Sequence, residues 1–353
     1  MPPDCENLKS EYNHIETLSQ EFDSALENSV KTGDFQKPDE LKKEIEQRIS
    51  SLREKLWPFE TLKKEQLKEQ YEAQKNALQN SNILEKLSTG ELGIKAIDGQ
   101  EYPIPQYEQM LQKLKENKEI LKTKEKQGFS QLLIVPFGLK LDDLTEKYKQ
   151  VLLNHKRQNK LFAAQKDPND PLIPLELDEN EPVWVWSDYQ NADGTGKLIY
   201  HPKEYSQNHQ GQTKQQLLQK TGQGFNILLI ENLPNIPREN KGQTVNNRPQ
   251  IEAGKSPNEY LELIKQNPAY EHESGLTPED WLTYAILHLE KTNQVIDDYE
   301  GNGSISYQLG SYFPASGRVP RASWLRGARR ALLAWVVPGR RASRCGARAG
   351  VRV

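Results

Sequence analysis

Side chains able to bind a metal or act as a nucleophile are few and scattered in this sequence. Its 353 residues include two cysteines, Cys5 and Cys345, and six histidines. Two distant cysteines exclude a disulfide-rich scaffold, and the histidine spacings match no common metal motif. The loop at Asp193-Gly194 lacks the alternating acids and final glutamate of a calcium loop, so it is predicted to be a turn. We therefore expect no metal, no cofactor and no catalytic residues.

Arginine stands out instead, because its distribution along the chain is uneven. All 50 Asp and Glu lie before residue 315, with 37 of the 47 Lys and Arg, so residues 1–314 carry a net charge of −13. Residues 315–353 hold 10 Arg and no acid, and they also lack Lys, Gln, Asn and Met. Three explanations fit such a change: GC-rich DNA read out of frame, a basic arm for nucleic acid, or codons written by a separate process.

The order of residues in this segment favours the third explanation. Ser323-Trp324 is followed by Arg330-Ala331, Pro338, Arg341 and the closing Gly346-Ala347-Arg348. This series resembles the C-terminal signature of the C-type lectin fold that formylglycine-generating enzymes share. It resembles more closely the variable proteins of diversity-generating retroelements. In that family an error-prone reverse transcriptase, acting at template adenines, rewrites the last segment of the lectin fold.

The resemblance implies which positions vary within a segment of about 318–353. Randomising the first two bases of an Asn codon never yields Lys, Glu, Gln, Met or Trp. The positions expected to vary obey this rule, as GC-rich out-of-frame sequence also would. They are Ser323, Leu325, Gly327, Ala328, Ala334, Val336, Val337, Arg340 and Arg344. The expected framework residues are Trp281, Trp324, Trp335, Arg341, Gly346 and Arg348.

The two sets of residues imply different physical roles. We expect Trp324 and Trp335 to fill the core, and Arg341 and Arg348 to pair with upstream acids. The variable positions should form a solvent-facing surface, with a small apolar patch and cationic edges. Such a surface suits an apolar or acidic region of a protein or peptide ligand.

Residues 1–127 are predicted to form a helical, coiled-coil-like region. Apolar residues recur at helical spacing from Asp39, a plausible N-cap, to the end expected at Pro58. They are Leu41, Ile45, Ile49, Leu52 and Leu56. Weaker stripes follow at 62–78 and 107–121. Stripes this narrow bury too little alone, so we expect the helices to pair with each other or with a second copy.

Residues 128–353 are predicted to form an α+β, C-type-lectin-like domain of mixed short strands and two helices. The helices are marked by Ser256-Pro257 and Thr277-Pro278, which combine a capping side chain with proline in the first turn. A further helical stretch is expected near 141–153, and a surface loop at 206–223. Strands are predicted at 132–135, 183–186, 197–200 and 225–230. The second and third of these flank Asp193-Gly194 and are expected to form a hairpin.

These features predict a ligand-binding protein rather than an enzyme. A formylglycine-generating activity is the less favoured alternative, because the resemblance implies a copper-binding cysteine pair and Cys345 is the only cysteine in the domain. Nucleic-acid binding through Arg329-Arg330 and Arg340-Arg341 is the other, although no aromatic ladder accompanies these pairs. The sequence contains no signal peptide or membrane-spanning run, so the expected location is cytoplasmic, with export by another route left open.

Overall fold

The computed structural model describes residues 3–55, 57, 59, 61–167 and 169–353, with the backbone alone at 3–8 and 53–55. The expected stripe residue Leu56 and helix end Pro58 lie outside the described residues. The chain divides into two compact units, Met1–Phe59 and Glu60–Val353. The boundary expected between 127 and 128 is therefore wrong.

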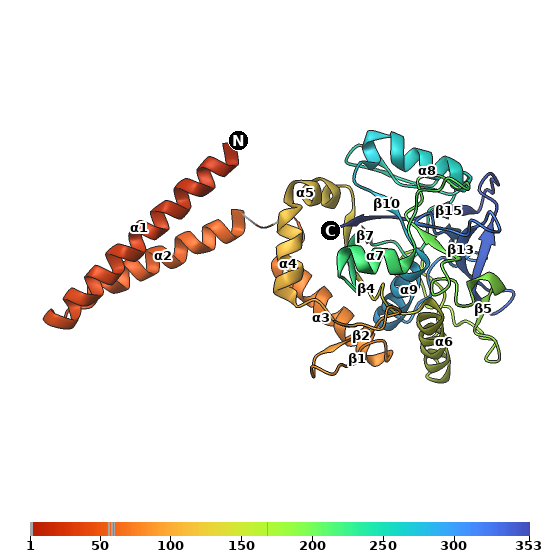
Figure 1. Ribbon diagram of the computed structural model, residues 1–353, viewed down its shortest axis with the longest axis horizontal. Helices are drawn as coiled ribbons and strands as arrows, with labels where there is room; N and C mark the ends of the chain where they lie inside the picture. Colours follow the sequence, from red (N-terminus) through yellow and green to blue (C-terminus); the bar gives the residue numbers. More distant parts are fainter. Residues whose placement is uncertain (1–2, 56, 58, 60, 168) are drawn as a thin grey trace. The chain divides into compact units, whose positions relative to one another are not determined.

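The first unit is a helical hairpin of α1 (Pro3–Thr32) and α2 (Gln36–Lys55) (Figure 1). Gly33, with a φ of 77°, provides the left-handed residue after α1. Helix α2 begins three residues before the expected N-cap Asp39, because Asp34 Oδ1 accepts a hydrogen bond from Gln36 N at 3.0 Å. The predicted helical character of this region is confirmed.

The other predicted N-terminal helices belong to the second unit. They form α3 (Lys64–Asn80), α4 (Tyr107–Glu116) and α5 (Lys118–Lys126). Gln74 of α3 joins this helix to the sheet, since its side chain donates to Leu132 O at 2.6 Å and accepts from Ile134 N at 2.9 Å. This attachment explains why the unit boundary precedes α3. A small sheet that the sequence did not predict lies between α3 and α4: β1 (Glu85–Lys86), β2 (Leu92–Lys95) and β3 (Glu101–Pro103).

One larger sheet has the order β10-β16-β7-β4, with antiparallel pairing throughout. Its strands are β10 (Ser274–Gly275), β16 (Ala349–Arg352), β7 (Asn226–Glu231) and β4 (Phe129–Val135). Helix α9 (Pro278–Thr292) contacts β4, and α6 (Leu141–Arg157) contacts α9. The strands expected at 132–135 and 225–230 and the helix near 141–153 are confirmed.

The second large sheet has the order β15-β11-β13-β14-β5, and Figure 1 labels β15, β13 and β5 of it. Its strands are β15 (Cys345–Ala347), β11 (Ile305–Tyr307), β13 (Val319–Leu325), β14 (Arg330–Val336) and β5 (Val183–Val185). Strand β5 pairs in parallel with β14, while β6 (Ile199–Tyr200) pairs with β12 (Ser311–Tyr312). The hairpin expected between 183–186 and 197–200 is therefore wrong, because each strand has a partner near the C-terminus.

Residues 206–223 were expected to form a surface loop, but they contain helix α7 (Lys214–Thr221). The side chain of Lys214 is fully buried. Its Nζ lies 2.6 Å from Asp193 Oδ2 and 2.9 Å from Glu279 Oε1. These long-range ion pairs fix the helix, and the polar local sequence does not reveal them.

Both predicted helix starts are confirmed. Ser256 Oγ accepts a hydrogen bond from Glu259 N at the start of α8 (Pro257–Gln266), and Thr277 Oγ1 accepts one from Asp280 N at the start of α9. The second unit also contains the short pair β8 (Thr244–Val245) and β9 (Arg248–Pro249). The chain is thus α+β, and the described residues of 128–353 form four α-helices rather than two. None of the described helices combines the length and apolar character needed to cross a bilayer.

Candidate ligand-binding face

The β13–β14 hairpin contains the residues that the sequence divided into variable and framework positions. Its antiparallel register places Ser323 opposite Leu332 and Leu325 opposite Arg330. Because side chains alternate between the faces of a strand, the hairpin has two distinct sides. We call one the outer side, formed by Arg321, Ser323, Leu325, Arg330, Leu332 and Ala334. The other is the inner side, formed by Ala322, Trp324, Ala331, Leu333 and Trp335.

The inner side joins the protein core. Trp324 is fully buried, and α9 contacts its strand. The backbone of Trp324 is also fixed, since its N–H donates to Asp297 O at 3.0 Å and its C=O accepts from Tyr299 N at 3.1 Å. The expected core role of Trp324 is therefore confirmed, and Trp281 of α9 is fully buried as well.

Trp335 is on the inner side but is only half-buried, so its expected core position is wrong. It lies near the end of β14, where the Arg318 guanidinium stacks 4.0 Å from its ring centroid. The ring centroid of Trp186, the residue after β5, lies 5.6 Å from that of Trp335, and Trp186 in turn contacts Phe313. Trp335 thus belongs to an aromatic group near the end of β14.

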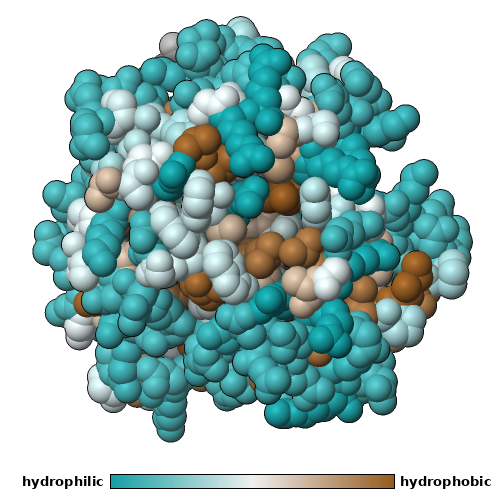
Figure 2. All heavy atoms as spheres, turned by 90° about the vertical axis from the view of Figure 1, so that its right-hand side faces the viewer, coloured by the Kyte–Doolittle hydropathy of each residue, from teal (hydrophilic) through white to brown (hydrophobic). Residues whose placement is uncertain are grey.

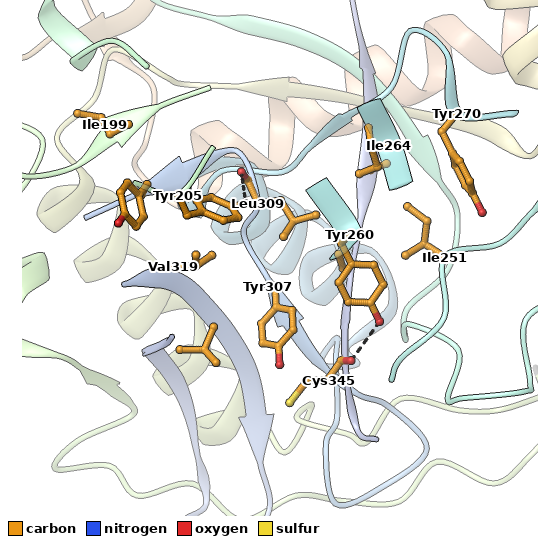
Figure 3. Packing of buried hydrophobic residues seen from close by; sticks show 14 residues of the cluster. Ile199, Tyr205, Ile251, Tyr260, Ile264, Tyr270, Tyr307, Leu309, Val319 and Cys345 are labelled. Carbon is orange, nitrogen blue, oxygen red and sulfur yellow. Dashed lines mark hydrogen bonds between the residues drawn. The ribbon is translucent and has the colours of Figure 1, made fainter. Parts of the chain in front are cut away.

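The outer side is covered at one end and open at the other. Val336, expected to face solvent, is only 3% exposed and lies with Val319 in the apolar cluster beneath α8. Figure 3 shows Val319, Tyr307 and Tyr260 of this cluster around the sheet. The expected exposure of Val336 is therefore wrong. Toward the hairpin turn, Leu325 and Leu332 remain partly exposed.

Ser323 and Ala334 are buried as well, which also contradicts their expected exposure. Both have short side chains and lie on the same side as longer, half-buried neighbours, Arg321, Leu325 and Leu332. Short side chains between longer ones do not project into solvent. Figure 2 shows the side of the molecule with β5, β13 and β15, where a central hollow has apolar residues at its base and polar residues around it.

The remaining expected variable positions lie in two loops beside the outer side. Gly327 is exposed and Ala328 is half-buried in the hairpin turn, which is closed by Arg329 N donating to Arg326 O at 3.0 Å. Val337 is 37% exposed, and Arg340 and Arg344 are also exposed in the loop after β14. These positions are exposed, as expected, except that Ala328 is exposed only in part.

Five of the ten C-terminal arginines form ion pairs with acids from earlier in the chain. The pairs are Arg326–Asp298, Arg330–Glu181, Arg341–Glu259, Arg348–Asp297 and Arg352–Asp280. Among the described residues, Arg318, Arg321, Arg329, Arg340 and Arg344 have no carboxylate within ion-pair distance. Internal pairing therefore neutralises half of the positive charge that suggested nucleic-acid binding.

Arg341 and Arg348, both expected to pair internally, do so in different environments. Arg341 is exposed, with Nε 2.8 Å from Glu259 Oε2, and the hydrogen bonds from Arg341 and Ser256 lower the pKa of Glu259 to about 2. Arg348 is buried, with Nη2 2.6 Å from Asp297 Oδ1. Burial lowers the pKa of Arg348, but the Asp297 carboxylate outweighs this effect and the net shift is upward.

Two further framework features support the turn between β15 and β16. A Cβ at Gly346 would lie 2.6 Å from Ile236 Cγ2, so only glycine fits without movement. Cys345 is buried beside the hydroxyl of Tyr307 (Figure 3). Burial raises the pKa of this tyrosine. Within the described part of the chain, no group of three His, Cys, Asp or Glu is placed to hold a metal.

The structure adds residues to the face that the sequence interpretation missed. Leu332 and Arg321 lie on the outer side, and Trp184 of β5 pairs with Leu332 and is also half-buried. Alternation along β13 and β14 would have indicated the first two. The parallel pairing of β5 with β14 links residues far apart in the sequence, so no local signal reveals Trp184.

Comparison with known proteins gives no relatives from which to transfer a function. No family model, curated protein or solved structure matches this chain significantly.

Proposed function

We propose that this protein binds a protein or peptide ligand through a diversified surface on a C-type-lectin-like domain. The supporting observation is the division of the β13–β14 hairpin. Its inner side anchors Trp324, while its outer side presents Leu325 and Leu332, bordered by loops that carry Val337 and Arg340. A rigid hairpin with tolerant loops is a suitable support for interchangeable side chains.

The exposed chemistry defines the class of ligand. The centre of the face is aliphatic and aromatic, from Leu325, Leu332 and Trp184, and its border carries the unpaired cations Arg329, Arg340 and Arg344. An apolar centre gives affinity when desolvated, while charges at the border act mainly on association rate and partner choice. The complementary ligand has an apolar patch bordered by carboxylates.

The same side chains support binding rather than catalysis. Leucine, valine and tryptophan take no part in acid–base or nucleophilic chemistry, and an arginine stays protonated at neutral pH. The face thus offers contacts for recognition and no group that transfers a proton. In this proposal the buried Cys345 packs beneath the loops and does not react.

The DNA around the coding sequence is expected to show whether the C-terminal segment was diversified. A near-copy of the segment for residues 318–353 should lie nearby, differing at adenines and adjacent to a reverse transcriptase gene. Sequencing the neighbouring DNA checks this. If another reading frame instead continues the Lys- and Glu-rich composition of residues 1–314, the segment is out of frame and the proposal fails.

Tolerance of substitution tests the face directly. We expect a library randomised at Leu325, Gly327, Val337, Arg340 and Arg344 to remain mostly folded, as measured by protease resistance on display. Selection against ovalbumin, an acidic probe protein, should then enrich binders.

The matched control is a library at exposed positions of α6: Asp143, Glu146, Gln150 and Asn154. It should fold as well but enrich fewer and weaker binders, since a convex helix offers no hollow. Equal enrichment from both libraries, or loss of folding in the first, would contradict the proposal.

A further inference from the structure

Helices α1 and α2 pack through a heptad seam. In α1 the seam positions alternate by four and three residues, and those in α2 do the same. All of them are buried or half-buried, whereas most of their neighbours are exposed. The seam residues are Glu11, Ile15, Leu18, Phe22, Ala25 and Ser29 of α1, and Pro38, Leu41, Ile45, Arg48 and Leu52 of α2. This pattern is typical of an antiparallel coiled coil.

The seam is too thin to stabilise the hairpin alone. Among the described side chains of α1 and α2, Leu18, Pro38 and Leu41 are the only apolar ones that are buried. Burying so few apolar side chains does not offset the conformational entropy lost in ordering the backbone of two long helices. A hairpin of this size therefore needs a further surface to bury.

A second apolar stripe lies directly beside the seam. Tyr12 is 64% exposed and Val30 is 73% exposed, and Leu26 and Phe35 are exposed as well. Tyr12 and Leu26 each follow a seam residue, as does the half-buried Ile49 of α2. Equivalent heptad positions of two antiparallel helices flank the same side of their seam, so these residues line one side of the hairpin.

The opposite side of the hairpin is polar. A groove there is lined by residues of both helices, including Gln20, Glu21 and Asn28 of α1 and Lys37 of α2. Its continuation along the hairpin is lined by His14 and Arg48. The two sides therefore differ sharply in chemistry, and only the stripe side offers apolar area for another protein surface.

We infer that the stripe side binds the same side of a second copy, which forms an antiparallel four-helix bundle. The register of the hairpin is given by Arg48, whose Nη1 lies 3.7 Å from Glu11 Oε2. If neighbouring helices are antiparallel, as in an up-down bundle, α1 of one copy lies beside α2 of the other at the same register. Tyr12 then meets Ile49 of the second copy.

The charges beside the stripe are complementary in this arrangement. Lys42 lies next to the stripe on α2, and the Glu11–Arg48 contact places it nearly level with Glu16 of α1. Both side chains are exposed within their own copy. In the bundle each Lys42 faces Glu16 of the second copy, so two symmetric ion pairs form. A second copy therefore buries the apolar stripe and also pairs both of these charges.

The area available also suits a specific dimer. The stripe from Tyr12 to Val30 is about 27 Å long at 1.5 Å per residue, and two packed helices are about 18 Å wide. Each copy thus contributes roughly 500 Å², and the total of about 1,000 Å² lies at the lower limit for specific interfaces. We therefore expect a dimer of moderate affinity. If the proposed ligand-binding function holds, the dimer presents two binding faces and gains avidity, but dimerisation itself does not depend on that function.

The test is the mass of the full-length chain, measured by light scattering during gel filtration over a dilution series. The wild-type protein should show twice the chain mass of 40.6 kDa. Leu26→Lys/Val30→Lys should give the monomer mass. The control Gln20→Lys/Asn28→Lys adds the same charge on the polar side and should remain dimeric. A monomeric or trimeric wild type, or a dimeric Leu26→Lys/Val30→Lys variant, would overturn the inference.

A charge reversal tests the register without adding charge to the apolar stripe. Glu16→Lys and Lys42→Glu, each at an exposed position, should weaken the dimer about two- to fivefold, as typical for an exposed ion pair. The double variant should restore the wild-type dissociation constant. Circular dichroism of each variant verifies that helix content is unchanged. If neither single variant weakens the dimer, the arrangement is wrong.

Discussion

Arg348→Met should lower the free energy of unfolding of the second unit by about 3–5 kcal/mol, the range for breaking a buried ion pair. Arg348 donates to Asp297 Oδ1 at 2.6 Å and to the carbonyl oxygens of Leu233 and Pro234 at 2.7 and 2.9 Å. Trp281 Nε1 also donates to Asp297 Oδ2 at 2.8 Å. Methionine fills similar space but leaves the buried Asp297 carboxylate without its cation.

Urea denaturation followed by tryptophan fluorescence measures this loss, because five of the six tryptophans lie in the second unit. Arg344→Met is the matched control, since Arg344 is exposed and should change stability by less than about 0.5 kcal/mol. Adding Asp297→Asn to Arg348→Met should recover part of the loss by removing the unpaired charge. Equal stability of Arg348→Met and Arg344→Met would show that the buried pair does not anchor the frame.

Trp324→Ala should cost about 3–5 kcal/mol, as expected for deleting a fully buried aromatic side chain. Trp335→Ala should cost only about 1–2 kcal/mol. Trp335 is half-buried, and a partly exposed stack with Arg318 contributes about 0.5–1 kcal/mol. The sequence assigned both tryptophans the same role, and the structure separates them.

Thermal melts of both variants, compared with the wild type, check this ranking. The Trp335→Ala protein should also stay folded well enough for binding measurements, whereas Trp324→Ala should lose binding together with its fold. Equal losses for the two variants, or a larger loss for Trp335→Ala, would contradict the assignment of Trp324 to the core and of Trp335 to a half-buried aromatic group.

Local patterns were sufficient for several parts of the fold. The capping side chains of Ser256 and Thr277 act within one turn of the chain, so the starts of α8 and α9 were predicted correctly. The apolar runs of β4 and β7 likewise identified strands in the four-stranded sheet. The pairing of Arg341 and Arg348 with acids was also anticipated, because an all-basic segment needs acids from the rest of the chain.

Other features depended on contacts between distant residues. Lys214 is buried because Asp193 and Glu279 surround it, and neither is near it in the sequence. Strand β5 pairs with β14 instead of forming a hairpin with β6, and this pairing places Trp184 on the candidate face. Helix α3 packs on β4 through Gln74, which moved the unit boundary away from residue 127.

The candidate face combines both kinds of information. The sequence by itself determined the α+β class and the basic C-terminal segment, and the codon rule separated the expected framework residue Trp324 from the expected variable residue Leu325, because composition and residue type can be read without knowing the fold. Only the tertiary structure decided which outer positions reach solvent. Val336 is buried in the apolar cluster that includes Tyr260 and Ile264 of α8, whereas the adjacent Val337 is exposed, because burial depends on what packs against each position.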